Sequence, residues 1–118
     1  MSGPLAEVVF EEERDLAVVA VRGEVDLSNV GEIGEAIRRR VPRSREVMLD
    51  LSDVEYLDSA AIAMLDGLRQ AGITAHLVAP PDCAAARLLT MVELGFPTHD
   101  TRASAAAGLR GRGSGPGV

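Results

Sequence analysis

The chain of 118 residues contains no lysine, no tryptophan, one cysteine, one tyrosine and two phenylalanines. Every basic residue is therefore arginine, which excludes chemistry that needs a lysine amine as the nucleophile. The single cysteine, Cys83, excludes an internal disulfide and a cysteine-rich metal site. The scarcity of aromatic side chains argues against a surface on which nucleic-acid bases stack.

Long hydrophobic runs and an excess of positive charge are also missing. The longest apolar runs, such as Leu16–Val21, are far shorter than the roughly 20 residues that a membrane span needs. The start of the chain lacks the basic-then-apolar pattern of a secretory leader. A net charge of −6 disfavours binding to nucleic-acid phosphates and anionic membranes, but tolerates basic protein partners. These features predict a cytoplasmic protein without a nucleic-acid or membrane partner.

Aliphatic residues are what the sequence has in abundance. Hydrophobic residues make up 47% of the chain, which is long enough for one domain with a core of valine, leucine, isoleucine and alanine. The spacing of apolar residues predicts strands at 5–10, 16–22, 45–51, 73–79 and 98–100, and helices at 30–41, 59–70, 83–94 and 101–109.

The order of these segments predicts an α/β fold. The first two strands, joined by a short polar turn, predict an N-terminal antiparallel hairpin. The alternating helices and strands that follow predict a mostly parallel sheet with helices packed on it. Residues 5–109 are expected to form the domain, after a flexible N-terminus at 1–4. The glycine-rich residues 110–118 are expected to be disordered, because they offer almost nothing to bury.

The most informative run is Leu49–Leu65, in which an apolar strand is followed by acidic residues and then by a helix. We expect an acidic turn at Asp53–Ser59, at the end of which Asp58 and Ser59 open a helix. A serine hydroxyl would then lie at a helix N-terminus, near the end of a sheet strand, where α/β folds keep their sites. The alternative is that Asp58-Ser59 is only a capping pair.

Catalytic machinery is hard to assemble from the remaining residues. His76 and His99 lie in or beside predicted strands without a cysteine or second histidine at ligand spacing, so each is interpreted as structural. No glycine-rich phosphate loop is present, and Cys83 is interpreted as a helix-start residue. The carboxylates of Asp26, Asp50, Asp53 and Asp58 could form a magnesium site or be solvated caps. A phosphoacceptor receiver domain is excluded, because that fold needs a lysine.

Three short segments occur in order along the chain: Gly23-Glu24-Val25-Asp26, Asp50-Leu51-Ser52 and Leu57-Asp58-Ser59. A fourth, Leu88–Phe96, has a Leu-Gly turn near its end. Together they resemble the anti-sigma factor antagonists, small bacterial STAS domains with the pattern Gly-Glu-Leu-Asp followed by Asp-Leu-Ser and Asp-Ser-(Ser/Thr)-Gly-Leu. The resemblance covers residues 5–109.

The resemblance implies a STAS fold without a cofactor or a reaction of its own. It also implies that an anti-sigma factor with serine-kinase activity phosphorylates Ser59, and that a phosphatase removes the phosphate. The unphosphorylated form would bind the anti-sigma factor and release a sigma factor, and the phosphorylated form would not bind. A monomer or weak dimer is expected. The expected partner-binding residues are Glu24, Asp26, Ser28, Asn29, Asp53, Tyr56, Asp58, Ser59, Ala60, Ala61 and Met64.

Phosphate on Ser59 is expected to change binding rather than folding. It adds roughly −1.5 to −2 charges at neutral pH. The free N–H groups and dipole of a helix N-terminus accommodate an anion, whereas Asp26, Asp53 and Asp58 repel it.

Two positions depart from the family pattern. Ala60 replaces the second hydroxyl, so Ser59 is the only acceptor in the motif, and Ala61 replaces the glycine. Alanine favours a helix over glycine by about 1 kcal/mol, which is compatible with a module that has lost phosphorylation. Two alternatives therefore stay open. One is an unswitched STAS module that joins a larger complex or binds a small ligand such as a nucleotide, and the other is a metal-assisted hydrolase.

Overall fold

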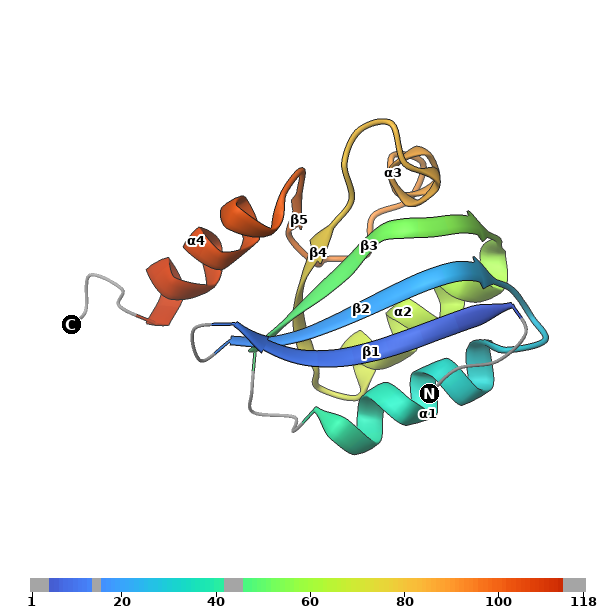
Figure 1. Ribbon diagram of the computed structural model, residues 1–118. Helices are drawn as coiled ribbons and strands as arrows, with labels where there is room; N and C mark the ends of the chain where they lie inside the picture. Colours follow the sequence, from blue (N-terminus) through green and yellow to red (C-terminus); the bar gives the residue numbers. More distant parts are fainter. Residues whose placement is uncertain (1–4, 14–15, 42–45, 114–118) are drawn as a thin grey trace.

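The computed structural model describes residues 5–13, 16–41 and 46–113. Its element order is the predicted one (Figure 1). The elements are β1 (Ala6–Glu13), β2 (Leu16–Val25), α1 (Val30–Arg40), β3 (Glu46–Leu57), α2 (Ser59–Gln70), β4 (Thr74–Val78), α3 (Ala84–Leu89), β5 (Thr98–His99) and α4 (Arg102–Gly113).

The five strands form one sheet in the order β1-β2-β3-β4-β5. β1 and β2 pair antiparallel, with Val8 opposite Val21, and every later neighbour pairs parallel. Parallel neighbours need a crossover, and α1, α2 and α3 each supply one. The predicted α/β fold, with an N-terminal hairpin and a mostly parallel sheet, is confirmed.

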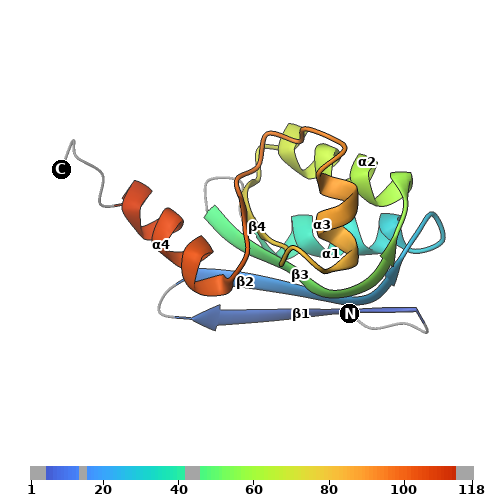
Figure 2. The same ribbon diagram turned by 90° about the horizontal axis from the view of Figure 1, so that it is seen from above.

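The aliphatic core lies in two layers, one on each face of the sheet. Helices α1, α2 and α3 lie on one side (Figure 2). Successive strand residues point to opposite faces, so Val19 faces these helices while Val18 faces away from them. On that second face, Leu109 of α4 packs in a smaller core with Val18, Met48 and Val78.

Strand β3 is longer than predicted, because the residues of the expected acidic turn belong to the strand as far as Leu57. Asp53 lies opposite Arg22 of β2, and Leu57 lies opposite Val25. Val54 is buried while Asp53 is exposed, so the segment keeps one face in the core and one in solvent. The exposed residues of this segment, Asp53, Glu55 and Tyr56, form the solvent side of the strand. Their polar character led to the wrong prediction of a turn. β2 likewise continues to Val25, past its predicted end at residue 22.

Helix α3 is shorter than predicted. It was expected to continue to Leu94, but it ends at Leu89, and Met91 is 76% exposed. The hydroxyl of Thr90 donates to the carbonyl oxygen of Arg87 over 2.8 Å. A threonine hydroxyl bonded to a nearby carbonyl oxygen competes with the backbone hydrogen bonds of a helix, which is consistent with the helix ending here.

Helix α4 is longer than predicted. It runs from Arg102 to Gly113, past the expected end at Leu109, so residues 110–113 are helical rather than the start of a disordered tail. The predicted flexible residues 1–4 and the rest of the predicted tail, 114–118, lie outside the described part of the chain.

Candidate functional site

The Ser59 side chain is exposed at the first position of α2. Asp58 caps this helix, since its Oδ1 accepts hydrogen bonds from the backbone N–H of Ala60 (3.0 Å) and of Ala61 (3.3 Å). The capping role considered for Asp58 is therefore observed. Within the described residues the Ser59 hydroxyl makes no hydrogen bond, so it is open to a reagent from solvent.

The occupied cap alters the expected environment of a phosphate on Ser59. The N–H groups of Ala60 and Ala61, expected to be free, are already bonded to the Asp58 carboxylate. A phosphate here would therefore meet a neighbouring negative charge that holds the anion-binding groups of the helix.

The β2–α1 loop is fixed by its own side chains. Asn29 donates through Nδ2 to the carbonyl oxygen of Glu24 (2.8 Å) and accepts through Oδ1 from the N–H of Asp26 (3.0 Å). Asp26 Oδ1 in turn accepts from the N–H of Ser28 (2.9 Å) and from its hydroxyl. Asn29 occupies the N-cap position of α1, but its side chain makes no capping hydrogen bond to the helix.

Gly23, the first residue of the Gly-Glu-Val-Asp motif, is required by its backbone. Its φ is +92°, and a Cβ at this position would collide with the carbonyl oxygen of Leu5. The same oxygen accepts the N–H of Glu24 over 2.7 Å, which joins the start of the chain to the end of β2. The motif therefore sets the path by which β2 enters the loop.

The two predicted partner segments leave the sheet side by side. Glu24 pairs with Tyr56 and Val25 with Leu57, so the loop after β2 and the start of α2 follow adjacent strand ends. The side chain of Tyr56 in this region is 50% exposed, and that of Leu27 is 80% exposed.

A groove of about 390 Å³ runs between α1 and α2, next to this end of the sheet. Leu27, Gly31 and Gly34 line one side of it, and Ala60 and Met64 line the other. Ala60 and Met64, both predicted to contact a partner, thus border the groove.

Ala61 does not reach the surface. It is 1% exposed and packs in the main core, because it lies on the α2 stripe that includes Leu65 and Leu68. The side chain of Ala61, a predicted partner-binding residue, is therefore not available at the surface for such a contact.

The four carboxylates considered for a magnesium site are engaged separately. Asp58 caps α2, Asp26 bonds to Ser28, and Asp53 forms an exposed ion pair with Arg22 at 3.7 Å. Among the described residues, no group of three or more His, Cys, Asp or Glu side chains is placed to hold a metal ion.

Asp50 anchors α4. Its Oδ2 accepts from Nε of Arg102 at 2.6 Å, and its Oδ1 accepts from the N–H of Ser52 at 2.9 Å. Arg102 also pairs with Glu13 and, at 3.5 Å, with Glu11. Burial acts to raise the pKa of Asp50, but the hydrogen bonds from Ser52 and Arg102 outweigh it and hold the pKa below its ordinary value.

The two histidines are paired with each other, which the sequence interpretation missed. Nδ1 of His76 lies 2.9 Å from Nε2 of His99, and Nδ1 of His99 lies 3.0 Å from the Ser104 hydroxyl. The signal that could have revealed this was the parallel pairing of two adjacent strands, each with one histidine.

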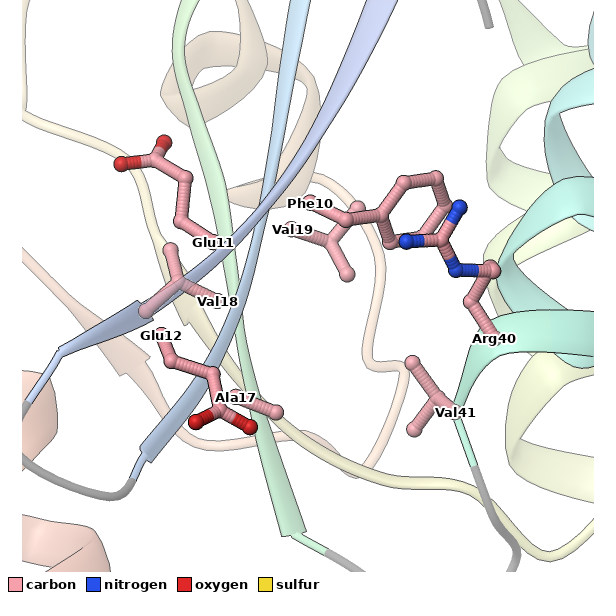
Figure 3. Close-up of a pocket in the computed structure, with 8 residues that line it drawn as sticks. All are labelled: Phe10, Glu11, Glu12, Ala17, Val18, Val19, Arg40 and Val41. Carbon is pink, nitrogen blue, oxygen red and sulfur yellow. The ribbon is translucent and has the colours of Figure 1, made fainter.

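A depression of about 210 Å³ lies near the β1–β2 turn, away from Ser59 (Figure 3). Its lining includes residues of both hairpin strands together with Arg40 and Val41. Phe10 and Glu11 point to opposite faces of the same strand, so the depression wraps around the sheet edge. The guanidinium of Arg40 lies over the Phe10 ring, 4.4 Å from its centre, and covers the apolar part.

Comparison with known sequences decides the family. Residues 8–95 match the sequence profile of the family described as Mlab, STAS domain. The chain belongs to the STAS domain family. Osmosensory protein A from Mycobacterium tuberculosis (strain ATCC 25618 / H37Rv) is 38% identical over 68 residues, which is 54% of this chain. The matched part is 43% of that protein, so this STAS chain corresponds to less than half the length of that relative.

Solved structures of other STAS-like proteins have the same fold. An anti-sigma factor antagonist from Mycobacterium paratuberculosis is 26% identical, with a TM-score of 0.74 over 93% of this chain and 99% of its own. A putative antagonist from Thermotoga maritima is 22% identical, with a TM-score of 0.65 over 87% of this chain and 94% of its own. Unphosphorylated SpoIIAA is 20% identical, with a TM-score of 0.61 over 89% of this chain and 97% of its own.

The helices also bear on the prediction that the chain has no membrane-spanning segment. Within the described residues, none of the helices is both long and apolar enough to cross a membrane.

Proposed function

We propose that this STAS domain is an anti-sigma factor antagonist in the cytoplasm, a binding protein rather than an enzyme. In its unphosphorylated state it binds an anti-sigma factor with serine-kinase activity and thereby releases a sigma factor. The observation that carries the proposal is the exposed Ser59 hydroxyl at the start of α2, beside the β2–α1 loop. The similarity to the antagonist from Mycobacterium paratuberculosis over 99% of that chain supports the same role.

The proposed binding face combines apolar contact with negative charge. Leu27 and Tyr56 offer exposed apolar surface, and the groove beside Ala60 and Met64 extends it. Four carboxylates, those of Glu24, Asp26, Asp53 and Asp58, lie in or directly after the paired ends of β2 and β3, so the partner is expected to present basic residues to this end of the sheet. Ser28 and Asn29 belong to the same face and hold the Asp26 turn in shape.

Phosphorylation of Ser59 would switch this face off. The added phosphate would lie next to the Asp58 carboxylate, which already occupies the N–H groups of Ala60 and Ala61. Two adjacent anions would have to be desolvated together in the complex, which costs free energy of binding. The fold would remain, because Ser59 is exposed and contributes nothing to the core. A phosphatase that removes the phosphate would restore binding.

The first experiment is incubation with candidate anti-sigma kinases and ATP, followed by mass spectrometry of the Ser59 peptide. The proposal expects one phosphate on Ser59 and none in the matched Ser59→Ala variant. Binding of the kinase without phosphate transfer would overturn the switch and leave only the binding role.

A second function uses the same face without a switch, as an interaction module of a larger complex or a small-ligand domain. Ala60 favours it, because the motif then offers a kinase one hydroxyl instead of two. For this function, Ser59→Asp and wild type bind the partner equally.

A further inference from the structure

Helix α4 is attached to the second face of the sheet at two separate places. At its start, Arg102 is held by Asp50 of β3 and by Glu11 and Glu13 of β1. Farther along, the helix packs on two imidazole rings, one from β4 and one from β5.

The two rings form a close pair under α4. Their centroids are 5.1 Å apart with an angle of 15° between the ring planes. His76 is 3% exposed, whereas His99 is half-buried and in contact with Ser104 of α4. A Cβ on Gly108 would lie 3.2 Å from atoms of both rings, so the helix backbone rests directly on the pair.

The 2.9 Å separation of His76 Nδ1 and His99 Nε2 requires a proton between these atoms. With both rings neutral, one nitrogen donates and the other accepts. With one extra proton on the pair, a charged ring still donates to a neutral ring, and the bond is strengthened. With two extra protons, two N–H groups and two positive charges face each other, and neither ring can accept.

We propose that the His76–His99 pair is a proton-operated latch for α4. The latch holds the helix while the pair carries at most one extra proton, and it opens when both rings are protonated. Opening removes α4 from Val18, Met48 and Val78, and so exposes an apolar patch on the second face of the sheet.

The effect of the histidine pair has to be separated from that of the charged groups on neighbouring elements, which include the Arg102 ion pairs. They are Asp100, just before α4, Glu46 and Asp50 of β3, and Glu11 and Glu13 of β1. Helix α4 itself carries Arg102 at its start and Arg110 and Arg112 near its end. Because the pKa of Asp50 is held low, the bond between Asp50 and Arg102 persists in the range, around pH 6.5, where histidine ordinarily gains a proton. Loosening of α4 in that range would therefore come from the imidazoles.

Hydrogen exchange of the full chain between pH 7.5 and pH 5 tests the latch. The measured quantity is the protection factor of the amides of Ala105–Leu109, corrected for intrinsic exchange, with the α2 amides as internal reference. The proposal expects a loss of at least tenfold in α4 relative to α2. Equal protection of the two helices across the range would overturn it.

Two variants give matched controls. In His99→Gln the side-chain amide can donate to His76 but cannot titrate, so α4 should stay protected at low pH. Arg102→Gln should lower the protection of α4 at every pH and still show the further loss of protection as the pH falls. If His99→Gln loses α4 at all pH values, the imidazole ¹⁵N shifts of the wild type decide. Double protonation of both rings as α4 opens supports the latch, and opening while one ring remains neutral overturns it.

Discussion

Nε of Arg102, at the start of α4, donates to Oδ2 of Asp50 on β3 over 2.6 Å, across 52 positions of the sequence. Asp50 belongs to the Asp-Leu-Ser motif, and its carboxylate anchors the last helix to the sheet. The carboxylate lies on the second face of the sheet and joins the last helix to the central strand. The same carboxylate also accepts from Ser52, so the motif residues hold each other in place.

Replacing Arg102 by glutamine is expected to destabilise the fold by about 1–3 kcal/mol, because the partly buried Asp50 carboxylate loses its charged donor. Urea denaturation measures the change. The matched control is Arg69→Gln, which breaks the exposed Arg69–Asp66 pair and should change the stability by less than about 0.5 kcal/mol. Equal losses in the two variants would contradict the anchoring role of Arg102.

Acid should weaken the same anchor. The pKa of Asp50 is lower in the folded chain than its ordinary value of 3.8. Its contribution to stability is therefore fully present above that ordinary value and is lost as the pH falls through the folded pKa. Asp50→Asn should be less stable than wild type at pH 7, with a difference that shrinks below about pH 4. A difference that is constant from pH 7 to pH 2 would show that the charge of Asp50 does not matter.

Gly23→Ala and Gly31→Ala should change stability in opposite directions. At Gly23, with φ of +92°, a methyl would meet the Leu5 carbonyl, and we expect a loss above about 1 kcal/mol. At Gly31, in helix α1, a Cβ would meet no described atom within 4 Å beyond its chain neighbours and the helix's own backbone, and alanine should gain about 0.5–1 kcal/mol. Thermal unfolding measures both. Stabilisation by Gly23→Ala would contradict the conformation described for the β2–α1 entry.

Asp58→Asn and Asp58→Ala distinguish the helix-capping role of Asp58 from the effect of its negative charge. Asparagine retains an acceptor oxygen for the N–H of Ala60 and should change stability little, whereas alanine should cost about 1 kcal/mol. Both remove the negative charge beside Ser59. If that charge helps to repel a phosphate from the complex, phosphorylated Asp58→Asn should bind the anti-sigma factor better than phosphorylated wild type. No recovery of binding in Asp58→Asn would assign the effect to the phosphate alone.

The sequence was sufficient for the order of elements because most strands and helices have a clear apolar period; β5, with only Thr98 and His99, has none. It failed at 52–57, where β3 extends beyond β4 and buries only Val54, three residues after the buried Leu51. Register shifts in the pairing with β2 interrupt the two-residue alternation of a regular strand there. Local pattern alone does not distinguish such a strand from a turn. The helix start at Asp58 was predictable, because capping depends on neighbours in the chain.

Contacts between distant residues were beyond the reach of that reasoning. His76 and His99 are 23 positions apart, and each was interpreted as a lone structural residue. The burial of Ala61 depends on which face of α2 meets the sheet. Both facts follow from packing between elements, which no short motif records.

The most direct test of the central claim is the affinity of the chain for a serine-kinase anti-sigma factor before and after phosphorylation of Ser59, measured by calorimetry. Ser59→Ala is the control that cannot be modified. We expect tight binding by the unphosphorylated chain and by Ser59→Ala, and a loss of at least tenfold after phosphorylation, with an unfolding temperature that changes little. Equal binding by both forms, or a phosphorylated chain that no longer folds, would contradict the account.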